Sequence, residues 1–367
     1  MMEHPENDDL YRGLKVNKGV ADVPTVNPYL KRRIQRKEYT PAEFVEGILK
    51  GNITILSQAV TLVESSKYEH QQVAQEIIEK CLPHAGKSVR IGITGVPGAG
   101  KSTSIDAFGM HLIGEGRKLA VLAIDPSSER SKGSILGDKT RMEALSREKN
   151  AFIRPSPSAG SLGGVARKTR ETIVLCEAAG FDTVFVETVG VGQSETAVHS
   201  MVDFFLLIQL AGTGDELQGI KRGIMEMADG IIINKADGDN LEKAKLAAAQ
   251  FRNALHLFPA PESGWFPKVL TYSGYYNLGI KEIWDMVGEY MEFTRKNGYF
   301  DYKRNEQAKY WMYESINDTL RETFYHNPAV ENMLNFTEQQ VLNNEISSFV
   351  AAKRMMDLFL ENLSAKK

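Results

Sequence analysis

A glycine-rich segment, Gly95–Ser102, limits the possible folds of this chain more than any other feature of the sequence. It reads Gly-Val-Pro-Gly-Ala-Gly-Lys-Ser and matches the pattern G-x-x-x-x-G-K-[ST]. An apolar run that ends at Thr94 precedes it, and residues 105–113, with apolar side chains at helical spacing, follow it. Strand, loop and helix in this order predict a loop that binds the phosphates of a nucleotide.

The chemistry expected of this loop follows from its residue types. Glycines let backbone N–H groups converge on phosphate oxygens, and the next helix adds the positive end of its dipole. Lys101 would neutralise the β and γ phosphates, and the Ser102 hydroxyl would bind Mg²⁺, which takes few ligands from a protein. We expect the nucleotide to contact Gly95, Val96, Pro97, Gly98, Ala99, Gly100, Lys101, Ser102 and Thr103.

The surrounding sequence alternates short apolar runs with helical patterns. This alternation predicts an α/β fold, a P-loop NTPase whose mainly parallel sheet is sandwiched by helices. Ligands of such sheets bind beyond the carboxyl ends of the strands, so the residues after each run are the first candidates for a site. The predicted strands are Arg90–Thr94, Leu119–Ile124, Thr183–Val186, Phe204–Leu210, Gly230–Ile233 and Lys268–Tyr272.

The pattern also predicts how the chain is divided. We expect a flexible N-terminal arm at 1–38, an N-terminal helical subdomain at 39–86, a P-loop domain at 87–296 and a C-terminal helical region at 297–367. Thr40-Pro41-Ala42-Glu43 has the residue order that begins a helix, and Phe44, Ile48 and Leu49 supply its apolar face.

The C-terminal region carries a stripe of apolar residues with a spacing of four. A second helical stretch, Phe349–Leu360, follows it. From the spacing alone, packing of the stripe on its own domain is favoured over a subunit interface. The stripe consists of Met312, Ile316, Leu320 and Phe324.

Carboxylates follow two of the predicted strands. Asp125 comes directly after Ile124 and is a candidate to hold Mg²⁺ or to position the attacking water, although Asp-Pro also begins ordinary turns. Glu187-Thr188-Val189-Gly190 occupies the place of the D-x-x-G element of GTPases, with Glu for Asp. Asp138 is a weaker candidate, since charged loops are usually solvated. Gln193 is more simply a loop glutamine than the residue that orients the water.

Asn234-Lys235-Ala236-Asp237 matches N-x-x-D in the form N-K-x-D and follows an apolar strand. The aspartate can accept hydrogen bonds from guanine N1–H and from the exocyclic amine, neither of which adenine offers in that place. The base is therefore predicted to be guanine. Ser273, Gly274 and Tyr275 follow the last predicted strand and are candidates for contacts to the base edge.

Charge and cysteine usage narrow the partners and the compartment. A net charge of -3 and a pI near 6.2 give no basic footprint for nucleic acid or an anionic membrane. Cys81 and Cys176 lack metal-ligand spacing and are expected to be reduced packing residues. The acidic start of the chain carries no apolar targeting segment, so we expect a cytoplasmic protein.

Six segments together resemble the MeaB/ArgK family of GTPases, to which the human methylmalonic aciduria type A protein belongs. The resemblance covers most of the chain, from the helical block to the helical tail, and Glu187 of ETVGVGQSE, in the place of the aspartate of D-x-x-G, marks a branch shared with metallochaperone GTPases. Older labels call the family a transport kinase, but the chain has no H-R-D or D-F-G signature of protein kinases. The segments, in order, are GVPGAGKST, AIDPSS, GDKTRM, ETVGVGQSE, GTGDELQGIK and NKAD.

The resemblance implies a homodimeric GTPase that acts as a chaperone of adenosylcobalamin-dependent methylmalonyl-CoA mutase or a sister acyl-CoA mutase. It would gate cofactor loading and protect the mutase from inactivation. Phosphate, Mg²⁺ and hydrolysis roles are implied for Lys101, Ser102, Asp125, Asp138 and Glu187. The segment 212–221, with Gln218 and Lys221, would be a switch that contacts the partner. Sequence alone favours an ordinary strand-to-helix connection there.

Two other functions fit part of the pattern. A nickel-type metallochaperone GTPase would carry a His-rich tract or paired cysteines, whereas this chain has seven scattered histidines and two isolated cysteines. A nucleotide-dependent scaffold would bind GTP and turn it over very little. The GTPase rate with and without a mutase distinguishes a regulated hydrolase from such a scaffold.

Overall fold

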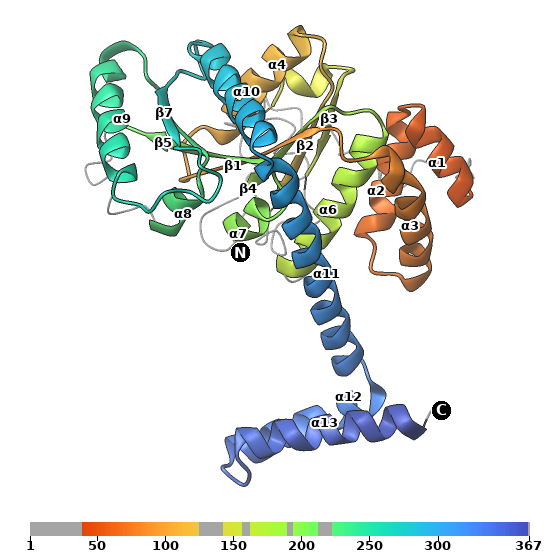
Figure 1. Cartoon of the computed structure of the whole chain (residues 1–367). Helices are drawn as coiled ribbons and strands as arrows, with labels where there is room; N and C mark the ends of the chain where they lie inside the picture. Colours follow the sequence, from red (N-terminus) through yellow and green to blue (C-terminus); the bar gives the residue numbers. More distant parts are fainter. Residues whose placement is uncertain (1–38, 125–141, 156–161, 189–193, 212–221, 366–367) are drawn as a thin grey trace, which may run out of the picture. The chain divides into compact units, whose positions relative to one another are not determined.

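The computed structural model describes residues 39–124, 142–155, 162–188, 194–211 and 222–365. The elements below all lie within Pro41–Lys367, the larger of two units of the chain. Seven parallel strands form one sheet in the order β3-β2-β4-β1-β5-β6-β7 (Figure 1). They are β1 (Val89–Gly95), β2 (Leu119–Ile124), β3 (Ala151–Arg154), β4 (Thr183–Thr188), β5 (Phe204–Leu210), β6 (Gly230–Asn234) and β7 (Lys268–Thr271).

The sheet confirms the predicted α/β fold, and the described strand pairs are all parallel. Strand β3 was not predicted. It has four residues, lies at the edge of the sheet and pairs only with β2, so it lacks the long apolar run of a central strand. Tyr272 lies just beyond β7, and its backbone N–H still donates to the carbonyl of Ile233 at 3.0 Å.

Helices cover both faces of the sheet. In the first half of the chain they are α1 (Pro41–Leu49), α2 (Ile53–Glu64), α3 (Tyr68–Cys81), α4 (Lys101–Gly114), α6 (Leu162–Ala178) and α7 (Ser194–His199). In the second half they are α8 (Arg222–Met227), α9 (Leu241–Leu255), α10 (Ile280–Lys296), α11 (Tyr299–Tyr325), α12 (Pro328–Leu342) and α13 (Ser348–Ala365). Short 3-10 turns lie at Leu82–His84, Leu145–Arg147 and Gly238–Asn240.

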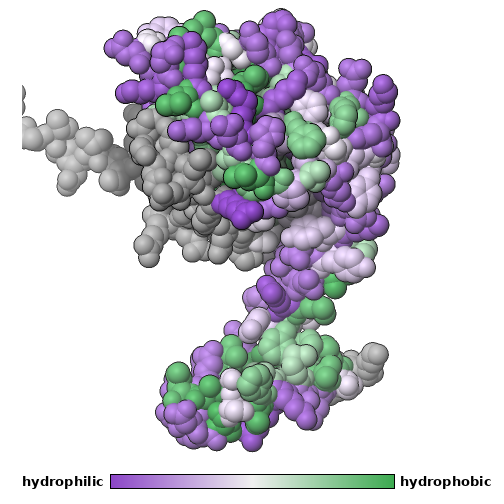
Figure 2. All heavy atoms as spheres, turned by 60° about the vertical axis from the view of Figure 1, so that its left-hand side comes forward, coloured by the Kyte–Doolittle hydropathy of each residue, from purple (hydrophilic) through white to green (hydrophobic). Residues whose placement is uncertain are grey.

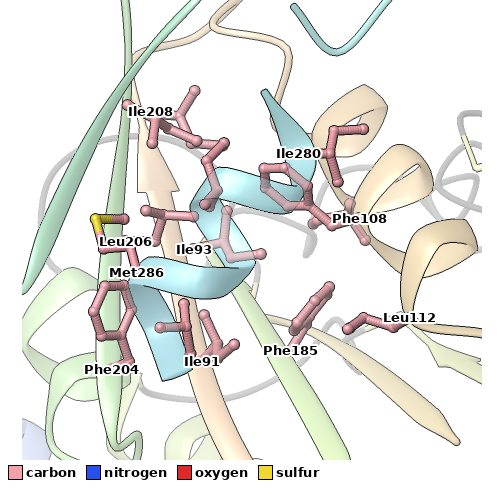
Figure 3. Packing of buried hydrophobic residues seen from close by; sticks show 14 of the residues in the cluster. Ile91, Ile93, Phe108, Leu112, Phe185, Phe204, Leu206, Ile208, Ile280 and Met286 are labelled. Carbon is pink, nitrogen blue, oxygen red and sulfur yellow. The ribbon is translucent and has the colours of Figure 1, made fainter. Parts of the chain in front are cut away.

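The main core lies between the sheet and helices α4 and α10 (Figure 3). Ile91 and Ile93 of β1 point into it beside Phe204 of β5. Phe108 of α4 and Met286 of α10 contribute to it from the helices. A second core lies on the opposite face, where α8 and α9 pack on β5, β6 and β7. Because both faces are covered, the central strands are nearly continuous apolar runs.

Helices α1–α3 fall within the predicted 39–86 block, and α1 begins at Pro41 as expected. Phe44 and Ile48 are buried, but Leu49 is 40% exposed, so its predicted place on the apolar face is wrong. It is the last residue of α1. Both cysteines are buried and free, as predicted. Within the described residues, the helices are too short or too polar to cross a bilayer.

Helix α11 packs on α10 and α6, whereas α12 and α13 pack on each other (Figure 1). Trp311 of α11 is buried, but Met312, Ile316 and Leu320 are 51%, 47% and 60% exposed. The expectation that this stripe packs on its own domain is therefore wrong for these three residues, whereas Phe324 packs against Phe359 of α13. The helix buries the face that carries Gln307 and Trp311 instead.

Candidate functional site

The segment Gly95–Ser102 connects β1 to α4 at the carboxyl edge of the sheet, next to the central strands β4 and β5. Two of its glycines are required by space. A Cβ at Gly95 would lie 2.3 Å from the carbonyl oxygen of Ile208, and one at Gly100 would lie 2.5 Å from Asn234 Nδ2. Gly100 also has a φ of +86°, which side-chain-bearing residues rarely adopt. The loop therefore passes closer to its neighbours than other residues would allow.

Helix α4 begins directly at Lys101, and no side chain caps its first turn in the part of the chain that the structure describes. Its N–H groups are therefore available to an anion, and the helix dipole adds positive potential at the same point. Lys101 Nζ donates to the carbonyl of Gly95 at 2.8 Å. Burial lowers the pKa of Lys101, while the negative charges of Glu187 and Glu195 oppose that shift.

Glu187 lies near the end of β4 and faces the phosphate loop. The Ser102 hydroxyl donates to Glu187 Oε1 at 3.4 Å. Next to it, Thr188 Oγ1 donates to Thr94 Oγ1 at 2.9 Å, which ties the ends of β4 and β1 together. The structure thus brings together the hydroxyl and the carboxylate that the sequence proposed as metal ligands.

Asn234, at the end of β6, joins three segments of the site. Its Nδ2 donates to the carbonyl of Ala99 at 2.7 Å, inside the phosphate loop. Its Oδ1 accepts from the backbone N–H of Lys235 at 2.7 Å and from that of Gly274 at 3.2 Å. Asn234 therefore fixes the distance between the phosphate loop and the predicted base-binding segments, a contribution that the sequence motif did not show.

Asp237 and Ser273 come from different strand ends and meet at this edge. The Ser273 hydroxyl donates to Asp237 Oδ2 at 2.5 Å. This bond leaves the second carboxylate oxygen for other donors. Tyr275 is 80% exposed, so its ring is held by few contacts from its own chain.

The structure describes part of the predicted site, and the other predicted residues lie outside the described part of the chain. The phosphate loop, Thr103 of α4, Glu187, Asn234–Asp237 and Ser273–Tyr275 all lie at the carboxyl edge of the sheet. The predicted residues that lie outside the described part of the chain are Asp125, Asp138, Gln193, Gln218 and Lys221.

Two further residues belong to this neighbourhood and were not singled out from the sequence. Glu195 is buried in the first turn of α7, at 3% exposure, and its charge acts on Lys101. It lies in the ETVGVGQSE segment, so its signal was present in a motif already noted. Tyr272 is buried, and its hydroxyl bonds to the Ser104 hydroxyl of α4, so it links the base-binding side to the helix after the phosphate loop. Nothing in the spacing of Tyr272 and Ser104 could show that contact.

The geometry brings Gly95–Ser102 and Asn234–Asp237 together at one sheet edge, and comparison with known proteins gives the family. The model of the family described as methylmalonyl Co-A mutase-associated GTPase MeaB matches residues 56–329. The chain belongs to the MeaB family. This confirms the resemblance drawn from the six sequence segments.

Two curated relatives of this MeaB family member are GTPases by name. A putative GTPase of Caulobacter vibrioides is 50% identical over 312 residues, which cover 85% of this chain and 95% of the relative. The GTPase ArgK of Escherichia coli is 44% identical over 320 residues, which cover 87% and 97%. The chain therefore spans nearly the whole of each relative.

A solved structure supports the fold over most of the chain. The crystal structure of a LAO/AO transport system kinase aligns with a TM-score of 0.70 and 38% identity, and the alignment covers 88% of this chain and 99% of that one. The MeaB family member described here is therefore a P-loop GTPase that binds guanine nucleotides.

Proposed function

We propose that this chain is an Mg²⁺-dependent GTP hydrolase that serves as a chaperone of an adenosylcobalamin-dependent acyl-CoA mutase, methylmalonyl-CoA mutase or a sister enzyme. The observation that carries the hydrolase part is the meeting of Ser102 and Glu187 at 3.4 Å beside Lys101. The mutase part is supported by the family description, which names association with methylmalonyl-CoA mutase. A cytoplasmic location is part of the same proposal.

The phosphate loop would hold the β and γ phosphates through its N–H groups and the first turn of α4. Lys101 Nζ, which now donates to Gly95 O, would exchange this carbonyl for phosphate oxygens. An ammonium in a partly buried site interacts more strongly with a phosphate than one in water. Lys101 would thereby stabilise the charge that develops as the γ phosphate leaves.

Ser102 and Glu187 fit a magnesium ion. Adjacent ligands of an octahedral Mg²⁺ at about 2.0–2.1 Å are roughly 3 Å apart. The Ser102 Oγ to Glu187 Oε1 separation of 3.4 Å is close to that value, and both atoms are hard oxygen donors. Bound there, the ion would neutralise charge on the β and γ oxygens. Asp125 is proposed as a third ligand or an aid to the attacking water, and Asp138 as a further catalytic residue.

Asp237 would read the guanine base. Its Oδ2 accepts a hydrogen bond from the Ser273 hydroxyl, so the carboxylate is already oriented. The next residue, Gly274, is held by a hydrogen bond from its backbone N–H to Asn234 Oδ1. Ser273, Gly274 and Tyr275 are proposed to cover the base edge. A carboxylate rejects adenine because the base presents an acceptor at N1 and lacks the exocyclic amine of guanine.

A homodimer is the proposed assembly. Helices α11, α12 and α13 line an apolar groove of about 720 Å³ whose walls include Leu320, Phe324, Leu342 and Met355. Figure 2 shows apolar side chains on the surface of the helices at the lower end of the view. Apolar area of this kind on a helical segment is typical of an interface. A second copy of the chain is the proposed occupant.

The chaperone role is tested by the GTP turnover of the full chain with and without its mutase. We expect the rate to rise and to saturate as mutase is added, and native mutase to co-purify with the chain. A rate that does not respond to mutase would contradict the chaperone proposal and leave the GTPase assignment in place. The metal is tested by Ser102→Ala, which should raise the Mg²⁺ concentration needed for half-maximal turnover.

Gln218 and Lys221 are proposed as switch residues. We expect Gln218→Ala and Lys221→Ala to retain GTP binding and mutase association but to lose much of the mutase-induced rise in rate, because they alter the response rather than the pocket. Arg222→Ala is a neighbouring control, since this exposed residue begins α8. Equal stimulation of wild type and both variants would assign 212–221 a structural role only.

A further inference from the structure

Helix α7 lies between the GTPase site and the C-terminal helices. Its first two residues, Ser194 and Glu195, are 2% and 3% exposed. The charge of Glu195 raises the pKa of Lys101 against the effect of burial, so the first turn of α7 is within electrostatic reach of the phosphate loop. The helix has six residues and spans only about 9 Å at 1.5 Å per residue.

The other end of α7 is bound by α11. Gln307 Nε2 donates to the carbonyl of Val202 at 2.8 Å and to that of His199 at 3.4 Å. Trp311 Nε1 donates to the carbonyl of Ser200 at 3.0 Å. The last carbonyls of a helix have no hydrogen-bond donors within the helix. Here the donors come from side chains of α11.

This contact is anchored on both sides. Arg304 donates from Nε and Nη2 to the two carboxylate oxygens of Asp203, at 2.8 and 2.7 Å. Lys303 Nζ donates to the carbonyl of Asp203 at 2.8 Å. Arg170 of α6 donates to the carbonyl of Gln307 at 2.9 Å, and its guanidinium lies 5.7 Å from the centre of the Trp311 ring. Side chains of α11 therefore form hydrogen bonds with residues 199, 200, 202 and 203 of the segment 199–203.

Helix α7 also packs on β1 without slack. A Cβ at Gly92 would lie 2.8 Å from Val198 Cγ1 and 3.0 Å from Val202 Cγ2. Gly92 is three residues before the phosphate loop, so α7 rests on the strand that presents the loop. A short helix in such a close-packed place moves as one piece, and a shift at His199 becomes a shift at Glu195.

We propose that Gln307 and Trp311 are positioning residues for GTP hydrolysis. Through the carbonyls of residues 199–202 they set where α7 lies, and through α7 they set the surroundings of Lys101. Both side chains bind backbone carbonyls at the N-terminal end of β5, whereas the nucleotide site lies at the carboxyl edge of the sheet. They therefore lie away from the nucleotide site, and their effect on hydrolysis passes through α7 and Lys101.

Two variants of the full chain test this. Trp311→Phe keeps an aromatic ring under Arg170 but removes the indole N–H together with part of the bicyclic ring, and Gln307→Met removes the amide donor at similar length. The matched control is Trp265→Phe, which removes an indole N–H bond of 2.9 Å to the carbonyl of Asp229 from a residue buried to the same degree. Trp265 lies in the connection before β7, and its indole bonds to the backbone of Asp229 and not to the carbonyls of residues 199–202.

The measurements are the single-turnover rate of GTP hydrolysis with Mg²⁺, the dissociation constant of GDP, and the melting temperature. We expect each α11 variant to slow hydrolysis by about three- to tenfold, the range that one lost neutral hydrogen bond corresponds to in a rate. GDP affinity should stay within about twofold of wild type. Trp265→Phe should lower the melting temperature by a similar amount and leave the hydrolysis rate unchanged.

Hydrogen exchange gives a second readout that a merely structural role would not move. In the α11 variants the amides of 194–200 should exchange faster while those of α9 should not. An unchanged hydrolysis rate in both α11 variants overturns the proposal. So does an equal slowing in Trp265→Phe, because the effect would then follow from stability alone.

Discussion

The carboxyl edge of the sheet and the C-terminal helices differ in how far their own chain completes them. At the sheet edge, Asn234, Ser273 and Ser102 are each hydrogen-bonded to another part of the site. On α12, α13 and the outer half of α11, large apolar side chains are exposed, among them Leu342 at 71% and Phe349 at 87%. Burial of apolar surface is the main force of association. The bonds of one region therefore lie within a single chain, while the other exposes the apolar surface that we propose a second copy covers.

The largest effect expected at the first region is that of Lys101→Ala. Its ammonium is partly buried beside the loop, so its removal should lower kcat/KM for GTP by roughly 10²–10³-fold. Steady-state turnover at saturating Mg²⁺ measures this. Lys118→Ala, an exposed lysine before β2, is the control and should behave as wild type. Mg²⁺-dependent turnover that is unchanged in both Lys101→Ala and Ser102→Ala would contradict the phosphate-loop assignment.

Asp237→Asn should change which base is bound. The amide turns one acceptor into a donor that faces guanine N–H groups, so GTP affinity should fall by roughly 10²-fold. The affinity for xanthine nucleotides should rise, because their O2 can accept from the new donor. Competitive titration with GTP and XTP checks the exchange. Asp239→Asn is the matched control, since this exposed aspartate lies two residues further along the chain. A wild-type preference for GTP in Asp237→Asn would mean that another residue reads the base.

His199, the last residue of α7, predicts a pH dependence of stability. Burial, with a smaller contribution from the charge of Lys303, lowers the pKa of His199 to about 4. The unfolded chain, with a pKa near 6.5, therefore binds this proton first, so stability is lost as the pH falls from about 6.5 to 4. The loss from this residue should be about 3 kcal/mol.

The variant His199→Gln isolates this contribution. Unfolding free energies of wild type and variant should diverge steadily between pH 4 and pH 7, with the wild type gaining more as the pH rises. His256→Gln is the control, because His256 caps the C-terminal end of α9. Parallel curves for wild type and His199→Gln would show that His199 is accessible to protons in the folded chain.

At the second region, Leu320→Glu should weaken self-association. Leu320 is 60% exposed and lines the apolar groove, so a carboxylate placed there would be desolvated when a second copy binds. We expect the dissociation constant of the dimer to rise about tenfold or more. Light scattering at micromolar concentration measures it. Leu257→Glu, at an 82% exposed leucine after α9, should leave the dimer intact. A wild-type chain that is monomeric with and without GDP would contradict the dimer proposal.

The sequence predicted six strands of the sheet and placed the residues of the proposed site after them, because both depend on local patterns. These six strands are mainly apolar runs, and G-x-x-x-x-G-K-[ST] and N-K-x-D follow two of them. Strand β3 escaped because four residues at a sheet edge carry too little apolar signal. Leu49 was misplaced because helical spacing does not show where burial along a helix ends.

Contacts between distant segments could not be predicted in the same way. The bond from Asn234 to Ala99 joins residues 135 positions apart, and that from Trp311 to Ser200 spans 111 positions. Both end on a backbone carbonyl, which every residue has, so the partner leaves no mark in the sequence. The sequence showed the apolar stripe of α11 but not which face of the helix is buried. The buried face carries Gln307 and Trp311, and these two residues do not belong to the apolar stripe.

The comparison of the two regions is tested most directly by the basal GTP turnover of the Leu320→Glu variant, measured with Mg²⁺ at a concentration where wild type is dimeric and the variant is not. If the nucleotide site is complete within one chain, the turnover per chain of the variant equals that of wild type within about twofold, since Gln307 and Trp311 still hold α7. A tenfold loss of turnover on dissociation would contradict this and would mean that the second copy supplies part of the site.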